Sequence, residues 1–188
     1  RTLVLLYADG NVDLLRLQTG TVEHLPHLAN YQQQELVVQR LRVQDDDAFV
    51  TTNAGFLWID VGQALVRGHF AVGQCLDVVQ WGGQIFAAFG GKLRQINRRS
   101  NFNDLSLWTL ALDAHVSAIA PSGKALFVAL DPDQGVNAGL WSLSAPSTSS
   151  LETMAAQVNP SAGWVHFDKE YRGSDLHIDA EGRLLAFQ

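Results

Sequence analysis

The sequence repeats one local pattern four times, and this repeat limits the possible folds more than any other feature. Each copy is an apolar strand, a loop ending in or near a glycine, a second strand, a turn and a third strand. The glycines of the four copies are Gly10, Gly55, Gly91 and Gly139. Short strands bounded by turn residues, with hardly any helical periodicity, predict an all-β chain.

A further strand and a tight turn precede three of the copies and follow the last one. The turns are predicted at Asp46-Asp47, Gly82-Gly83, Ser122-Gly123 and Glu181-Gly182. Each structural unit therefore contains four strands, which we name a, b, c and d, joined mainly by short turns. We expect one domain over residues 1–188, with units at roughly 1–45, 46–81, 82–121 and 122–188.

The strands predicted at position b are apolar on both faces, as in Ala125–Leu130, whereas those at position c mix apolar and polar residues, as in Lys92–Asn97. A strand packed between two neighbouring layers has to be apolar on both faces. A β-sandwich or jelly roll of many short strands is the alternative fold, but it does not predict the repeated strand–glycine–strand order. Four tryptophans fall in or beside strands and are predicted to pack between sheets: Trp58, Trp81, Trp108 and Trp141.

The segment LRLQTG at residues 15–20, a strand followed by a Thr-Gly turn, is similar to blades of quinoprotein-like propellers. Together with the period, it makes the whole chain resemble the WD40-like and quinoprotein-like β-propellers, although the Gly-His and Trp-Asp pairs of true WD40 repeats are absent. The resemblance implies about four blades, each a four-stranded antiparallel sheet, and no particular activity.

Residues 2–7 and 183–188 are both predicted at strand position b. The chain therefore has one strand b more than four blades require. We therefore expect a segment of a larger ring, with a small closed or self-associating propeller as the alternative. Open sheet edges would pair with the remaining blades or with another copy.

Two connections are longer than the others, and strand parity places both on one face of the predicted propeller. They are residues 131–139, between strands b and c, and about 159–174, between strand d and the next strand a. Residues 150–158 are predicted as the intervening strand d, with a short helix as the alternative. Loops on a rigid scaffold commonly carry binding residues. The candidate binding residues are Asp131, Asp133, Asn137, Trp164, His166, Asp168, Glu170, Tyr171 and Arg172.

Aromatic and charged residues in one loop suit recognition of a partner, so we predict a non-catalytic binding or scaffolding propeller with a protein partner. The alternatives are a glycosidase- or lactonase-like hydrolase and a carbohydrate-binding module that holds a small polar ligand or sugar on the same face. A glycosidase would need Asp133 to face Asp168 or Glu170 across a cleft.

No catalytic residue, cofactor or metal site is predicted. Residues 131–135 depart from a calcium-binding loop because Gly135 stands where a side-chain oxygen is required. Cys75 is the only cysteine and is expected to be buried and unreactive. The net charge of −6 argues against non-specific nucleic-acid binding, and no apolar run reaches the length of a membrane span. Nothing in the sequence assigns a cellular location.

Overall fold

The structure confirms an all-β fold made of short antiparallel strands. The computed structural model describes residues 1–7, 11–25, 37–123, 125–131, 138–144, 164–168, 175–178 and 183–187. Seventeen strands and one 3₁₀ turn, η2 (Leu105–Leu107), lie within these residues. None of the described segments forms an apolar helix of the length that a bilayer crossing requires.

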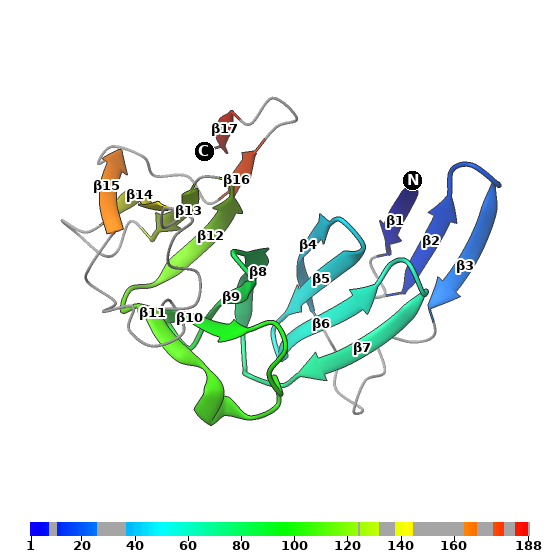
Figure 1. The fold of residues 1–188 in the computed structure, drawn as a ribbon, viewed down its shortest axis with the longest axis horizontal. Coiled ribbons are helices and arrows are strands. Elements are labelled where there is room, and N and C mark those ends of the chain that lie inside the picture. The colour runs from blue at the N-terminus through cyan, green and yellow to red at the C-terminus, as the bar shows by residue number, and fades with distance from the viewer. Residues whose placement is uncertain are drawn as a thin grey trace. The chain divides into compact units, whose positions relative to one another are not determined.

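The chain divides into two compact units, of which the first comprises Arg1–Cys75 and contains two sheets (Figure 1). In each sheet, strands that follow one another in the chain are neighbours. The first sheet supplies strand positions b, c and d, and the second supplies a, b, c and d. The first sheet is β1 (Thr2–Leu6), β2 (Val12–Arg16) and β3 (Thr21–Leu25). The second is β4 (Val38–Gln44), β5 (Asp47–Thr52), β6 (Gly55–Asp60) and β7 (Leu65–Phe70).

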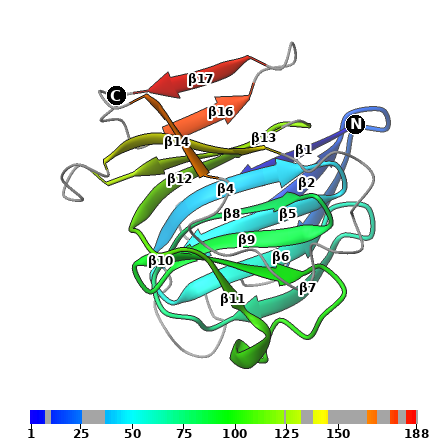
Figure 2. The same ribbon diagram turned by 60° about the vertical axis from the view of Figure 1, so that its left-hand side comes forward.

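The second unit, Leu76–Gln188, contains two four-stranded sheets and one strand pair. The third sheet is β8 (Cys75–Trp81), β9 (Gln84–Phe89), β10 (Lys92–Asn97) and β11 (Thr109–Leu112). The fourth is β12 (Val116–Pro121), β13 (Ala125–Leu130), β14 (Gly139–Ser144) and β15 (Trp164–Asp168). The last pair is β16 (Asp175–Ile178) and β17 (Leu184–Phe187). Figures 1 and 2 show β16 alongside β12, and the two strands are in contact.

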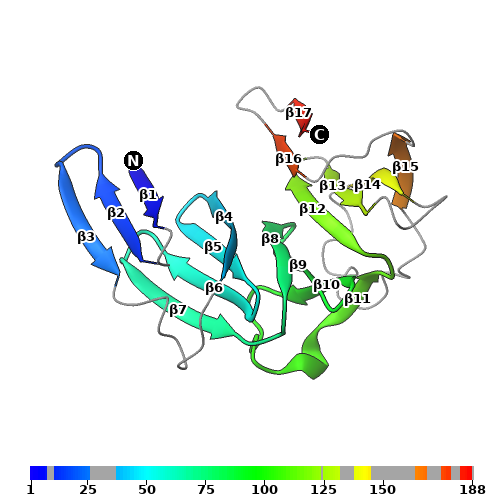
Figure 3. The same cartoon turned by 180° about the vertical axis from the view of Figure 1, so that it is seen from behind.

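In the first unit the core lies between the first and second sheets. Figure 3 shows the strands of these two sheets from behind. Apolar side chains from both sheets form one buried cluster, which includes Val12, Leu14, Val50, Leu57 and Ile59. Every residue of β5 and β6 is buried. This confirms that strand b of the second sheet is covered on both faces, and it shows that strand c of this sheet is covered as well. In β1, the strand b of the first sheet, no residue is fully buried.

In the second unit two apolar clusters join consecutive sheets. The larger cluster joins the third and fourth sheets and includes Trp81, Leu93, Ile119 and Leu126. The smaller cluster joins the fourth sheet to the last strand pair through residues that include Ala118, Ala120, Ala129 and Leu176. The small alanine side chains allow the neighbouring strands to approach closely.

Two polar contacts also fix the third sheet against the fourth. Asp77 is fully buried in β8, and its Oδ2 accepts a hydrogen bond of 2.8 Å from the backbone N–H of Ile119 in β12. The indole Nε1 of Trp81 donates to the backbone carbonyl of Ser122 at 2.5 Å. Since Ser122 belongs to the β12–β13 turn, Trp81 packs between sheets as predicted. Trp141 of β14 packs against the apolar cluster that joins the third and fourth sheets, also as predicted. Trp58 and Trp108 contact Phe49 and Phe89 of their own sheets, and their packing between sheets stays a prediction.

The predicted hairpin turns agree with the structure except for a one-residue shift. Gly82 and Gly83 both have positive φ values, of 58° and 76°, as a two-residue hairpin turn requires. The predicted Asp46-Asp47 turn is wrong, since Gln44 pairs with Asp47 and the turn residues are Asp45 and Asp46. The Asp47 carboxylate accepts a 2.8 Å hydrogen bond from Trp58 Nε1, which keeps Asp47 within the strand. The Glu181-Gly182 turn lies outside the described residues.

The glycine at the start of strand c is required by both backbone angle and space. Gly55 has a φ of 140°, and a Cβ built there would lie 1.9 Å from the carbonyl oxygen of Phe70 in β7. No L-residue fits this position, because the obstructing atom belongs to the backbone of the neighbouring strand. Gly91 and Gly139 share a positive φ, of 70° and 116°, but no atom lies within 4 Å of a Cβ built at Gly91.

Replacing Gly55 by alanine should lower the free energy of unfolding by about 4 kcal/mol or more, because strand β7 would have to move. The matched control is Gly20→Ala. Gly20 has a φ of 71° with no atom within 4 Å of a built Cβ, so only the backbone cost of about 1–2 kcal/mol applies. Urea unfolding followed by circular dichroism measures both losses. Equal losses would contradict the steric explanation.

Replacing Asp77 by alanine should lower the free energy of unfolding by about 1–3 kcal/mol, because the Ile119 N–H would remain buried without its acceptor. Gln39→Ala is the matched control, since Gln39 also lies near the start of a strand a but is exposed. It should change the midpoint of urea unfolding little. A loss for Asp77→Ala no larger than for the control would show that the contact does not stabilise the fold.

Candidate functional site

The described part of the predicted site lies at one end of the fourth sheet. At this end β13 leads into the b–c connection, and β12 begins after the preceding d–a connection. We call it the insertion end. Asp131 follows β13 directly, and its backbone N–H donates to the carbonyl of His115 at 3.0 Å. The Asp131 Oδ2 and His115 Nδ1 atoms are 3.1 Å apart. Backbone and side-chain contacts thus tie the start of the b–c connection to the end of the preceding d–a connection.

The placement of the second insertion was wrong. Residues 164–168 were predicted in a loop, but they form β15, which pairs with β14 as the fourth strand of the sheet. The alternation of apolar and polar residues in WVHFD is typical of a strand. The loop prediction follows from assigning strand d to residues 150–158, which lie outside the described residues.

The strand register divides the predicted insertion between the two ends of the sheet. Asp168 pairs with Leu140, one residue after the b–c connection, so it lies at the insertion end. Trp164 pairs with Leu143 and therefore lies toward the opposite end, and His166 pairs with Trp141 between them. The connection over residues 145–163 joins strands c and d, whereas residues 169–174 join strand d to the next strand a.

The predicted binding residues are therefore only partly brought together. Asp131 and Asp168 share the insertion end, and Trp164 does not lie there. The other candidates lie outside the described residues: Asp133, Asn137, Glu170, Tyr171 and Arg172.

The Asp131–His115 pair combines polarity with accessibility. The two side chains are 30% and 41% exposed, so each keeps atoms available to solvent or to a ligand. A carboxylate and an imidazole held in this way can accept or donate hydrogen bonds to a partner surface. In the part of the chain that the structure describes, no group of three or more His, Cys, Asp or Glu side chains could hold a metal ion. Cys75 is buried, as predicted.

A second polar cluster, which the sequence analysis missed, lies in the first sheet at the end where β1 leads into the b–c connection. The Tyr7 hydroxyl donates to Asp13 Oδ2 at 2.8 Å, and His24 Nδ1 lies 2.7 Å from Asp13 Oδ1. Asp13 stands among the apolar residues Val12, Leu14 and Leu15 of β2, directly opposite His24 in the register. That interruption was the available signal, but the pairing with His24 depends on the register.

The environment of Asp13 stabilises its ionised form. Hydrogen bonds from His24 and then Tyr7 hold the pKa of the Asp13 carboxyl below its ordinary value. The His24 side chain is 77% exposed, whereas that of Asp13 is only 13% exposed. The cluster therefore holds a nearly buried carboxylate beneath an accessible imidazole and links strands b, c and d.

The Asp13 pKa predicts an acid-dependent contribution to stability. Because the folded-state pKa is lower than the unfolded-state value of about 3.9, the contribution is complete above that value and is lost as the pH falls through the folded-state pKa. Asp13→Asn should therefore flatten the fall of unfolding free energy below about pH 4. Urea unfolding at a series of pH values measures this slope. If the unfolding free energy of the variant fell with decreasing pH as steeply as that of the unchanged protein, Asp13 would not be the source of this pH dependence.

Several solved structures are similar to most of this chain, and their low identities show the fold alone. PorZ of Porphyromonas gingivalis, described as an essential bacterial surface component of the type-IX secretion system, has a TM-score of 0.63 and 22% identity over 76% of this chain. The chain spans only 19% of that PorZ structure. The Pan2 WD40 domain of Neurospora crassa has a TM-score of 0.53 and 14% identity, over 95% of this chain and 54% of its own.

A chain of a mitotic checkpoint complex gives a TM-score of 0.55 and 13% identity, over 97% of this chain and 69% of its own. No curated protein sequence matches the chain. Residues 1–109, more than half of the chain, match the family described as TSS9, PorZ, N-terminal beta-propeller domain. The strand repeat, the four-stranded sheets and this match lead to one conclusion: the chain belongs to the family of PorZ N-terminal β-propeller domains.

Proposed function

We propose that this chain is a non-catalytic propeller module that binds a protein partner through the insertion end of its fourth sheet. The observation that carries the proposal is membership in the PorZ N-terminal propeller family. The PorZ structure is described as a surface component of a secretion system, and a component of such a system must contact other proteins. Propellers expose loops at the ends of rigid sheets, and this geometry suits contact with a partner.

The insertion end is the best-supported position for the partner. Asp131 and His115 supply an accessible polar pair, and the register brings Asp168 to the same end. The connections that enter and leave there also carry Asp133, Asn137, Glu170, Tyr171 and Arg172, a set that includes both signs of charge and an aromatic ring. Aromatic residues and arginine are enriched where proteins bind one another.

The hydrolase alternative has less support. It requires two carboxylates that face each other at a defined separation. Two of its three candidates, Asp133 and Glu170, lie outside the described residues, so no geometry supports that pair. A sugar or other small polar ligand would use the same hydrogen-bonding groups, and the experiment below distinguishes it from a protein.

The test compares the proteins that co-purify with the intact parent protein and with variants of it, isolated from its own cells. Asp131→Arg combined with Tyr171→Ala should reduce at least one co-purifying protein tenfold or more, because charge and aromatic contact are lost together. Quantitative mass spectrometry of the purified material measures the change.

The matched control is Asp46→Arg combined with Leu65→Ala. It changes the same number of exposed side chains and also reverses one carboxylate, but both residues belong to the second sheet, at the end opposite to its b–c connection. It should leave the co-purifying proteins unchanged. If the insertion-end variant retained every partner at the control level, the proposed binding surface would be wrong. Binding of a purified oligosaccharide that Asp131→Arg abolished would favour the carbohydrate alternative instead.

A further inference from the structure

The connection between strands c and d of the third sheet is longer than those of the first two sheets. It spans residues 98–108, whereas the c–d connections of the first two sheets span residues 17–20 and 61–64. The extra residues contain η2, which projects beyond the strands of its sheet, next to β11, in Figures 1, 2 and 3. It belongs to the end of the strands opposite to the b–c connections, so it is separate from the insertion end.

This connection exposes two large apolar side chains. Leu105 and Leu107, both in η2, are 56% and 44% exposed. Phe102 and Trp108 are 7% and 4% exposed and flank the helical turn in the sequence. The connection therefore buries its two aromatic residues and leaves its two leucines exposed side by side on the turn.

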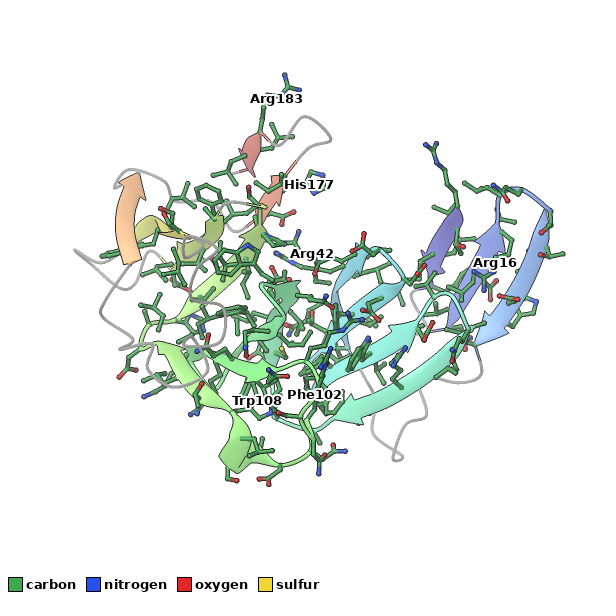
Figure 4. The ribbon with its side chains drawn as sticks, viewed as in Figure 1. Arg16, Arg42, Phe102, Trp108, His177 and Arg183 are labelled. Carbon is green, nitrogen blue, oxygen red and sulfur yellow. The ribbon has the colours of Figure 1, made fainter. Side chains whose placement is uncertain are left out.

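Several contacts hold the turn in one conformation. Trp108 Nε1 donates to the carbonyl of Phe102 at 3.0 Å, and the Trp108 ring meets Phe89 of β9 edge-on at a centroid distance of 5.3 Å. Figure 4 shows Phe102 and Trp108 beside each other at the base of the connection. Asp104 caps η2, since its Oδ1 accepts a hydrogen bond from the Ser106 N–H at 3.0 Å. The two leucines are thus presented in advance of any binding, which reduces the entropy lost on association.

The charges of the connection indicate the chemistry of what it meets. Arg98 and Arg99 are exposed at its start, and Asp104 is its single acidic residue, so the connection is locally cationic. The chain as a whole carries a net charge of −6. A partner that receives the leucines should therefore offer carboxylates around an apolar pocket.

We propose that η2 is a docking element, whose Leu105 and Leu107 enter an apolar pocket edged by carboxylates on a protein partner. The apolar contact supplies affinity, and the arginines set the orientation and accelerate encounter. This surface does not depend on the insertion end, and substitutions at one end should leave binding at the other unchanged.

The test places the photo-crosslinking residue p-benzoylphenylalanine at position 105 of the intact parent protein, in its own cells. Position 65 is the matched control, because Leu65 is also an exposed leucine, 39% accessible, next to a c–d connection. We expect irradiation to produce a protein adduct from position 105 at least tenfold above that from position 65. Mass spectrometry then identifies the partner and the segment that is cross-linked.

Binding of the purified partner completes the test. L105S combined with L107S should raise the dissociation constant at least tenfold. It should leave the thermal unfolding midpoint unchanged, because both side chains are exposed. R98E combined with R99E should weaken binding similarly, and replacing a carboxylate by lysine in the partner's cross-linked segment should restore it. The proposal is overturned by an adduct no stronger than the control, by an adduct with a second copy of this chain or with lipid, or by binding that these substitutions leave unchanged.

Discussion

The fold depends on sheets that are apolar on both faces. In the second sheet, Val50 and Leu57 pack toward the first sheet, while Phe49, Phe56 and Trp58 meet one another on the other face. The apolar side chains of such a sheet are removed from water only if another layer covers each face. Stacked repeats therefore stabilise one another, and each repeat is stable through its neighbours rather than alone.

Polar contacts then make the packing specific. Burial of valine and leucine is compatible with many arrangements of two sheets. The Asp77 carboxylate keeps its hydrogen bond only in the arrangement in which the Ile119 N–H faces it. Trp81 adds a second directional contact through its indole N–H. A buried acceptor without its donor costs free energy, so such contacts penalise a shifted register.

Rigid sheets leave the connections at their ends free to vary, and both surfaces proposed for binding are connections. One lies where b–c and d–a connections meet, at Asp131 and His115, and the other is the c–d connection that contains η2. Neither changes the pairing of the strands beside it. This separation of core from connections is the reason why one propeller framework can serve different partners.

The sequence by itself determined the strand repeat, three hairpin turns among the described residues to within one residue, and the need for glycine before strand c. These features are local, because strand alternation and positive φ values are set by a few adjacent residues. The tertiary structure alone decided that residues 164–168 complete the fourth sheet, that Asp13 meets Tyr7 and His24, and that Asp168 and Trp164 lie toward different ends. These facts depend on which strands pair and in which register, and the pairing is decided by packing between residues far apart in the sequence.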